Sequence, residues 1–402
     1  MKSYFLAAAI LFQLTCALQS KLTRRNFAIT TATSLVSLVP ESSSSLTPPL
    51  SPTVQSKMSS KLLSPRPAIV AVIGYTGGVG GCLLSAMDRI GLKPFALVRS
   101  STMQIDGSDD MPVDFTELGK RLLAAASKEG GTPIIADVTA SSIPQEHYKD
   151  WLSQGISVCT ANKGIFAGPE SKYQELLTAT KPPTRLLYET TVGAGLPVLG
   201  TISSLRESSH KILKIEGILS GTLAFVLGAV SGGKMTFSDA VLKAKDLGYT
   251  EPDPRLDLGG IDVARKAVIL ARLSGLTGIE LTGLDVESLV PKPLQDCSVD
   301  EFMAGLSAYD NDFAARVASI EKNPGNRLHY AAKVDVVNKK ITVAPMAVDA
   351  SHPFNSAGPD NLVAITTDLY SPRPLVVQGA GAGGDVTATG VLADILECTR
   401  SM

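Results

Sequence analysis

One stretch of this sequence combines acids and a lysine in a pattern that suits proton chemistry. Residues 247–272 are organised around four carboxylates and one lysine, namely Glu251, Asp253, Asp257, Asp262 and Lys266. Pro252 and Pro254 fix φ and disfavour a helix around the acid between them, so the sequence predicts that the acids lie on a defined loop. A glycine pair then precedes an amphipathic helix that we expect to begin near Ile261 or Asp262.

Asp262 and Lys266 are four residues apart, which places them one turn apart on the same face of the expected helix. A solvated pair of this kind contributes about 0.3 to 0.5 kcal/mol and has no chemical role. The flanks favour another interpretation, because they are strongly apolar and the turn before them is rigid. A lysine held among acids beside an apolar wall suits proton transfer, since burial lowers its pKa and carboxylates raise it. The pattern does not decide which effect prevails.

Four motifs in this chain resemble the homoserine dehydrogenase family. They are GYTEPDPRLDLGGIDVARK at 248–266, YETTVGAGLPVLGTISSL at 188–205, GILSGTL at 217–223 and QGAGAGGDVTATGVLADIL at 378–396. The resemblance runs from about Pro67 to the C-terminus and is strongest to the short, monofunctional, fungal-type enzymes without an ACT domain. It implies NADP-dependent interconversion of L-homoserine and L-aspartate 4-semialdehyde, on the route to threonine, methionine and isoleucine.

The fold that we expect is α/β, with a Rossmann-type dinucleotide-binding domain and an α+β catalytic and dimerisation domain that has a mixed sheet. Residues 61–187 form the cofactor domain, which residues 378–402 complete, and residues 188–377 form the catalytic domain. Strand patterns at 327–336 and 340–348, joined by a short turn, predict antiparallel pairing in the second domain. A sheet of that kind with one exposed face favours a homodimer.

The expected cofactor site begins where the apolar run 68–74 enters a glycine-rich turn, followed by a helix from Cys82 to Ile90. Such glycines let backbone N–H groups approach a pyrophosphate at a helix N-terminus. The spacing is GxxGxxG, looser than the usual family motif, and glycine turns also occur where no nucleotide binds. The candidate residues in this turn are Gly74, Thr76, Gly77, Gly78, Val79 and Gly80.

The residues that follow the expected second strand, 94–98, indicate which cofactor is preferred. These residues are Arg99 and Ser100. An arginine with hydroxyl groups suits a 2′-phosphate, so we expect NADP(H) to be preferred and NAD(H) to be possible. A solvated Arg99 with no role is the alternative. The resemblance adds three positions at the cofactor, Thr139, Lys163 and Gly383.

The chemical step assigns roles to the lysines. An alkoxide that develops during carbonyl reduction would repel carboxylates, so Lys266 is the candidate acid and base, with Asp262 orienting it. Lys163 is the rival, because the resemblance places it beside cofactor and substrate. The substrate-binding residues that the resemblance implies are Thr222, Glu251, Asp257, Asp262 and Lys266. Leu256 stands where many relatives have a second acid, which puts any role of that acid in doubt.

The resemblance also implies a sodium ion in the glycine-rich loop after Tyr188, held by Glu189, Val192, Ala194 and Leu196. Hard cations prefer oxygen ligands, and such a loop exposes carbonyl oxygens. The alternative is a hinge loop without an ion. Thr191 replaces the family's usual alanine.

Two other functions are the alternatives to this one. The first is a semialdehyde oxidoreductase with a cysteine nucleophile and a phosphate substrate, which neither Cys159 nor Cys297 suits by its local sequence. The second is a catalytically silent NADP-binding sensor, which the acids and lysines disfavour.

Composition limits the partners. The 402 residues carry 37 basic and 38 acidic side chains, which gives no reason to expect nucleic acid. The five cysteines are scattered without ligand spacing, so we expect neither a disulfide framework nor a zinc site.

Residues 1–60 have the composition of a targeting leader. An apolar run, Phe5–Leu14, precedes a basic, Ser/Thr-rich segment that has no acid before Glu41. This order resembles a bipartite plastid leader, so we expect a plastid enzyme that has no membrane segment after processing. Initiation at Met58, which would give a cytoplasmic enzyme, and a twin-arginine signal are the alternatives.

Overall fold

The computed structural model describes residues 66–400. The expected leader, residues 1–60, lies outside the described residues. Within 66–400, no helix is both long and apolar enough to cross a membrane.

The first sheet is built around five parallel strands, with the strand order β4-β3-β2-β1-β5-β6-β7. Its strands are β1 (Ala68–Ile73), β2 (Ala96–Val98), β3 (Thr102–Ile105), β4 (Met111–Pro112), β5 (Thr132–Asp137), β6 (Ser157–Thr160) and β7 (Leu186–Leu187). The pairs β2–β3 and β3–β4 are antiparallel, and β3 and β4 form a hairpin appended to the edge of the parallel strands. The sheet thus has the Rossmann-type arrangement expected from the sequence.

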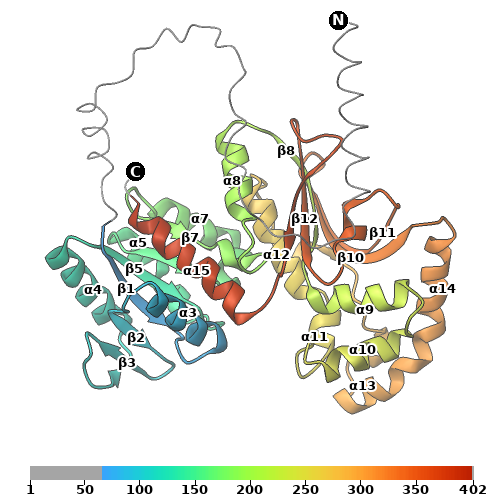
Figure 1. Cartoon of the computed structure of the whole chain (residues 1–402), viewed down its shortest axis with the longest axis horizontal. Helices are drawn as coiled ribbons and strands as arrows, with labels where there is room; N and C mark the ends of the chain where they lie inside the picture. The colour runs from blue at the N-terminus through green and yellow to red at the C-terminus, as the bar shows by residue number, and fades with distance from the viewer. Residues whose placement is uncertain (1–65, 401–402) are drawn as a thin grey trace, which may run out of the picture. The chain divides into compact units, whose positions relative to one another are not determined.

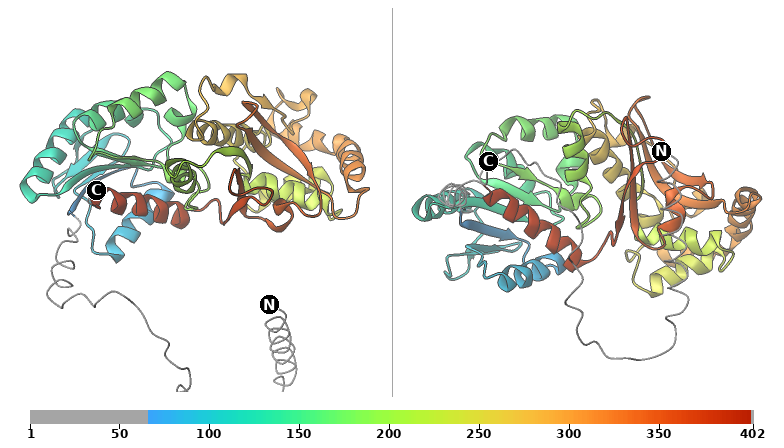
Figure 2. Two further views of the ribbon diagram at one scale, coloured as in Figure 1. Left: turned by 90° about the horizontal axis from the view of Figure 1, so that it is seen from above. Right: turned by 45° about the horizontal axis from the view of Figure 1, so that its top comes forward.

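Alternate side chains of β1 enter two separate cores, because successive residues of a strand point to opposite faces. Ile69, Ala71 and Ile73 pack against α4 (Phe115–Glu129), α5 (Tyr148–Ser153) and α7 (Glu170–Ala179). Val70 and Val72 pack instead against α3 (Gly78–Arg89) and α15 (Gly384–Thr399). Figures 1 and 2 show α15, in red, lying beside α3, in blue, although the two come from opposite ends of the described chain.

The second sheet is mixed, with the order β13-β12-β8-β10-β11-β9. Its strands are β8 (Ile212–Ile218), β9 (Asp285–Val286), β10 (Arg327–Asp335), β11 (Lys340–Val348), β12 (Asn361–Thr367) and β13 (Leu375–Gly379). All its pairs are antiparallel except β11 with β9. The remaining helices are α6 (Gly164–Ala167), α8 (Leu199–Glu207), α9 (Gly221–Ser231), α10 (Phe237–Asp246), α11 (Arg255–Leu258), α12 (Ile261–Leu273), α13 (Val299–Gly305) and α14 (Asp310–Glu321).

The two faces of the second sheet are covered differently. Val363 and Ile365 of β12 join the large core that includes α9 and α12. Leu362 and Ala364 face the other way, into a small cluster with Phe354 from the loop after β11. The mixed sheet expected from the sequence is therefore present, with one face packed on helices and the other on a loop.

Two helix starts and one hairpin differ from what the sequence patterns indicate. Helix α3 begins at Gly78 rather than Cys82, so three of the loop glycines lie in its first turns. Helix α15 begins at Gly384, within its own glycine turn, and ends at Thr399. In both cases glycine has a low intrinsic helix propensity, which hides the helix start from sequence patterns. The β3–β4 hairpin was not foreseen, because its strands are short and carry no long apolar run.

Two candidate residues lie on helices, although the sequence predicts a loop around Asp257. Asp257 lies in the one-turn helix α11, which Pro254 precedes at the N-cap. A proline is compatible with the start of a helix, because it has no N–H and the first N–H groups of a helix have no partner within the helix. Thr222 lies in the first turn of α9, which the Ser220 hydroxyl caps by accepting from the Leu223 N–H.

Candidate active site

A cavity of about 680 Å³ lies at the carboxyl ends of β5 and β6, where ligands bind in open α/β sheets. Helix α12, the loop after η2 (Glu189–Thr191) and the turn before α15 complete its wall. The residues that line it are Val79, Val138, Thr139, Ala140, Ala161, Asn162, Lys163, Gly164, Ala167, Gly168, Thr190, Thr191, Gly193, Ala194, Asp262, Arg265, Lys266, Leu281, Gly381, Ala382, Gly383 and Thr387.

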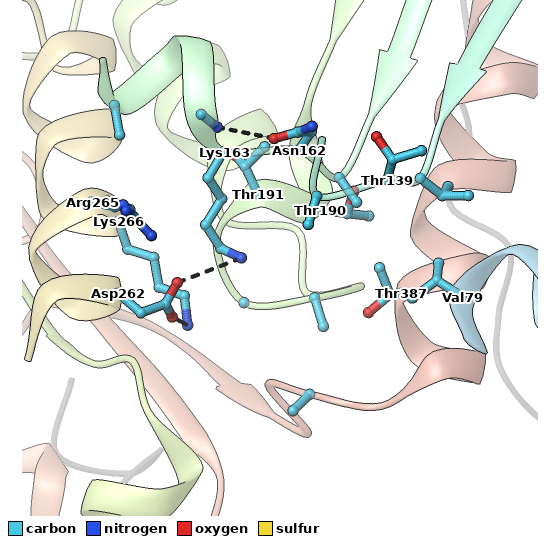
Figure 3. A pocket seen from close by; sticks show the side chains of 18 of the residues that line it. Val79, Thr139, Asn162, Lys163, Thr190, Thr191, Asp262, Arg265, Lys266 and Thr387 are labelled. Atoms are coloured by element: carbon cyan, nitrogen blue, oxygen red, sulfur yellow. Dashed lines mark hydrogen bonds and ion pairs between the residues drawn. The ribbon is translucent and has the colours of Figure 1, made fainter. Parts of the chain in front are cut away.

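The three expected catalytic residues meet in this cavity. Lys266 Nζ lies 2.9 Å from Asp262 on the same face of α12. Lys163, which directly precedes α6, reaches the same carboxylate from the other side at 3.6 Å. Figure 3 shows the two ammonium groups converging on Asp262. Lys266 Nζ also donates to the carbonyl of Leu219, 2.5 Å away, at the end of β8.

Burial sets the protonation tendencies of this group. Burial lowers the pKa of Lys266, while the charge of Asp262 opposes this effect and that of Lys163 adds to it. Burial would raise the pKa of Asp262, but the two lysines outweigh it and hold that pKa below its usual range. Half of the Asp262 side-chain surface, 51%, is exposed, so water screens part of this attraction.

The expected substrate-binding residues form a second group beside the first. The Asp257 carboxylate accepts from the Glu251 N–H at 2.8 Å, and Thr222 Oγ1 lies 3.3 Å from it. Burial raises the pKa of Asp257, and the charges of Glu251 and Asp262 add to this rise. None of these three side chains is among the residues that line the cavity.

Of the four carboxylates expected around Lys266, only Asp262 contacts it within the described residues. Asp253 pairs with Arg255 at 2.8 Å. That guanidinium also donates to the carbonyl of Cys297 at 2.6 Å, so it anchors the proline-rich turn to a later loop. The role of Asp253 is therefore to fix the shape of the turn.

Two glycine turns meet at the cofactor side of the cavity. Gly74 has φ +89°, and a Cβ there would lie 2.6 Å from Thr139 Cγ2. A Cβ at Gly80 would lie 2.2 Å from the carbonyl oxygen of Gly74. A Cβ at Gly384 would lie 3.0 Å from Cys82 Sγ. A Cβ at Gly74 or Gly80 would force the neighbouring atoms to shift, and the close approach of Gly384 to Cys82 brings the N-termini of α3 and α15 together.

The expected cofactor residues divide into two sets. Val79, Thr139, Lys163 and Gly383 line the cavity, whereas the rest of the first glycine turn and the end of β2 lie outside that lining. Arg99 is paired with Asp110, and its Nε donates to Thr102 Oγ1 at 2.6 Å. The guanidinium is thus held beside an acid of the β3–β4 hairpin, and Ser100 follows as an exposed residue.

The expected sodium loop is tied to the start of α8. The Glu189 carboxylate accepts from the N–H groups of Leu199 and Gly200 at 2.6 and 2.7 Å, and burial raises its pKa. Val192 is fully buried, and Ala194 has a positive φ of 55°. Leu196 closes the turn by donating to the Gly193 carbonyl at 3.0 Å. Within residues 66–400, no cluster of three or more His, Cys, Asp or Glu side chains is arranged to hold a metal.

Several lining residues were not foreseen. Asn162 and Arg265 adjoin the two candidate lysines, so proximity in sequence was a usable signal. The Asn162 amide donates to the Ser141 carbonyl at 2.8 Å and accepts from the Gly164 N–H at 3.1 Å, which orients the loop before α6. The unforeseen lining residues also include Thr190, Thr191, Leu281, Gly381, Ala382 and Thr387, and of these Leu281 has no sequence signal at all.

This geometry can deliver a proton to an oxygen that gains negative charge next to a dinucleotide turn. It does not offer thiol chemistry, because no cysteine of the described residues lines the cavity. Cys159 is fully buried, and its Sγ lies 3.6 Å from that of Cys398, on the side of the sheet that faces α15.

Comparisons with known proteins agree with this arrangement. The homoserine dehydrogenase family model matches residues 197–396, and the model of the homoserine dehydrogenase NAD-binding domain matches residues 76–189. A homoserine dehydrogenase of Schizosaccharomyces pombe is 38% identical over 356 residues, which cover 82% of this chain and 94% of that protein.

A chloroplastic bifunctional aspartokinase/homoserine dehydrogenase of Zea mays is 42% identical, over 83% of this chain. The chain spans 38% of that maize protein's length. A solved structure of a hyperthermophilic archaeal homoserine dehydrogenase mutant in complex with NADPH is 25% identical, with a TM-score of 0.60, and covers 83% of this chain and 97% of its own. The resemblance seen in the four motifs is confirmed, and the chain belongs to the homoserine dehydrogenase family.

Proposed function

We propose that this protein is an NADP-dependent homoserine dehydrogenase that interconverts L-homoserine and L-aspartate 4-semialdehyde. The observation that carries the proposal is the convergence of Lys163 and Lys266 on Asp262 in a cavity bordered by the glycine turns. The similarity of the chain to the homoserine dehydrogenases named above also supports it. The reaction would belong to threonine, methionine and isoleucine biosynthesis.

The residues of the cavity have distinct tasks in this proposal. A bound nicotinamide would supply the hydride, and the chain would stabilise the charge that develops on the substrate oxygen. Lys266 gives that oxygen a proton, because its lowered pKa makes the ammonium a better acid. Asp262 holds Lys266 in place, and the nearby carboxylates of Asp257 and Glu251 suit the substrate ammonium group.

The residues present fit a dinucleotide. The tight approaches at Gly74 and Gly80 leave backbone N–H groups at the start of α3 open to a pyrophosphate. Val79, Thr139 and Gly383 would then border the nicotinamide end. NADP is the preferred form in this proposal because Arg99 ends β2, and because the archaeal relative was solved with NADPH.

A monovalent cation, sodium, is part of the proposal. The loop from Glu189 to Leu196 offers backbone oxygens and a buried carboxylate whose raised pKa a nearby cation would lower again. Loss of activity or thermal stability on dialysis against a bulky organic cation, restored by sodium or potassium, would support the ion. Indifference to that dialysis would count against it.

A plastid location is also part of the proposal. The maize relative is named as chloroplastic, which agrees with the composition of residues 1–60. A fusion of these residues to a fluorescent reporter should enter the plastids of the native cell type. A diffuse cytosolic signal would favour initiation at Met58.

The deciding experiment for the activity is oxidation of NADPH by the purified chain with L-aspartate 4-semialdehyde. We expect turnover that stops when Asp262 is replaced by alanine, and formation of one homoserine per NADPH consumed. A folded protein that binds NADPH but does not turn over would favour the silent sensor instead.

A further inference from the structure

Helix α12 carries a second buried cation beyond Lys266. The Arg272 side chain exposes only 1% of its surface. Burying a guanidinium without partners costs several kcal/mol, so its partners indicate what it is for. It donates to three backbone carbonyls, those of Phe166 at 2.6 Å and of Gly168 and Ile279 at 2.7 Å each.

Two of these carbonyls belong to the end of α6, the one-turn helix that follows Lys163 directly. The Ala167 N–H donates to the Lys163 carbonyl at 3.0 Å, so the backbone of Lys163 moves with this turn. A single turn has little stability of its own, because helix nucleation is unfavourable. The position of Lys163 therefore depends on what holds the other end of α6, where Arg272 binds two carbonyls and the Phe166 ring stacks on Tyr188 at 4.1 Å.

Further contacts hold Arg272 itself, although its Nε is buried without a hydrogen-bond partner among the described residues. Glu280 lies 3.6 Å from its guanidinium and accepts from the Glu170 N–H at 2.9 Å. The Glu170 carboxylate in turn accepts from the Ile279 N–H at 2.9 Å. The ring of Tyr173 lies 5.8 Å from the guanidinium carbon. The charge is thus oriented from several sides, and its direction toward α6 is fixed.

We propose that Arg272 is a positioning residue, which holds α6 against α12 so that Lys163 stays within reach of Asp262. The same helix provides Asp262, Lys266 and Arg272, so a rigid α12 sets both lysines relative to one carboxylate. A planar guanidinium can satisfy three carbonyls that a lysine cannot reach together, which explains an arginine at this position. The inference rests on the proposed function, because it predicts an effect on that reaction.

The test is a double-mutant cycle with Arg272→Lys and Lys163→Ala, measured as kcat for semialdehyde reduction. Turnover by the unaltered protein first establishes the proposed function independently. Arg272→Lys should lower kcat roughly 10- to 100-fold, the size expected for a small misplacement of a reacting group. In the Lys163→Ala background the same change should lower kcat less than about 2-fold, because the group that it positions is gone.

Arg206→Lys is the matched control. Arg206 also donates to a carbonyl near the end of α12, that of Leu273, but it is exposed and, within the described residues, has no hydrogen bond or ion pair to α6. It should leave kcat unchanged, and in the Arg272→Lys and Lys163→Ala variants the dissociation constant of NADPH should change less than kcat. Additive effects of Arg272→Lys and Lys163→Ala, or a kcat loss that only follows the unfolded fraction, would overturn the proposal.

If Arg272→Lys does not fold, Glu280→Gln in the same cycle decides the question. Glu280 is half exposed, and the amide retains an acceptor for the Glu170 N–H. Loss of its charge should lower kcat by about 2- to 5-fold, as expected for a partly exposed ion pair. That loss should vanish in the Lys163→Ala background, and an unchanged kcat in the otherwise unaltered protein would overturn the proposal.

Discussion

Single residues in the cavity differ in how far burial changes their acidity. The Lys266 side chain exposes 10% of its surface and that of Lys163 exposes 31%. Burial disfavours the charged ammonium of Lys266 and lowers its pKa. Asp262 moderates this effect in Lys266 by attraction. The ion pair of Lys266 with Asp262 therefore places a proton donor, held in position by a carboxylate, beside the expected position of the substrate oxygen.

The pH profile should report this balance. Reduction needs the charged Lys266, so its rate should fall as pH rises through the lowered pKa of this lysine; oxidation needs the neutral form and should rise over the same interval. Asp262→Asn removes the attraction that raises this pKa. In this variant we expect the pH at which the rates of reduction and oxidation change to be lower. Glu251→Gln, which leaves the Lys266 contact intact, should not change that pH. An unchanged pH dependence in Asp262→Asn would contradict this assignment.

Arg99 should set cofactor preference. Arg99→Ala should raise the KM for NADPH about 10- to 100-fold, the equivalent of losing a hydrogen bond to a charged group, with little change for NADH. Asp110→Asn is the comparison, because it removes the carboxylate that now pairs with Arg99. It should leave the KM for NADPH unchanged or lower it. Equal changes for both cofactors in Arg99→Ala would refute the assignment.

At the scale of elements, helix α12 depends on how it starts. Gly260 has φ +74° at its N-cap, and a Cβ there would lie 2.0 Å from the Tyr330 hydroxyl. That hydroxyl donates to the Glu287 carbonyl at 2.8 Å, so it cannot move aside without losing a partner. The turn that delivers Asp262 is therefore packed against the second sheet through one tyrosine.

Gly260→Ala should be costly for that reason. A left-handed alanine costs about 1 to 2 kcal/mol by itself. Overpacking against Tyr330 should add about 1 to 3 kcal/mol, and kcat should fall because Asp262 is displaced. Gly233→Ala isolates the backbone cost, since Gly233 has a similar φ of +64° and no atom near its Cβ position. Similar free energies of unfolding for the two variants would show that the Tyr330 contact is unimportant.

The elements also show how far the sequence predicts the structure. The apolar run of β1 and its glycine turn identified the first core, because buried parallel strands and tight turns have strong local signals. The start of α3 and the β3–β4 hairpin lacked such signals. Lys163 and Asp262 were each singled out as candidates, but their contact depends on the packing of α6 on α12, which no local pattern encodes. Leu281 enters the cavity for the same reason, through tertiary packing alone.

At the scale of the whole molecule, the described chain folds into two sheets, and its last helix returns to the first sheet. The chain leaves the first sheet after β7, builds the second sheet, and returns through β13 to place α15 on the first. The cavity therefore draws its residues from early, middle and late parts of the sequence. One face of the second sheet is covered by a small cluster around Phe354 rather than by the large core that includes α9 and α12.

We expect that sheet to support a homodimer. The molar mass in solution, measured by light scattering with size-exclusion chromatography, should be about twice that of the purified chain, and it should stay so at low micromolar concentration. An antiparallel sheet with a lightly covered face favours such pairing. A mass of one chain across that concentration range would contradict it.

The most direct test of the account is kcat for semialdehyde reduction by Lys266→Ala, compared with Lys163→Ala and the unaltered protein. Loss of the general acid should lower kcat of Lys266→Ala roughly 10²- to 10⁴-fold, with NADPH affinity and melting temperature near those of the unaltered protein. A Lys266→Ala protein with nearly normal turnover, beside a folded but inactive Lys163→Ala protein, would contradict the account and transfer the proton donor role to Lys163.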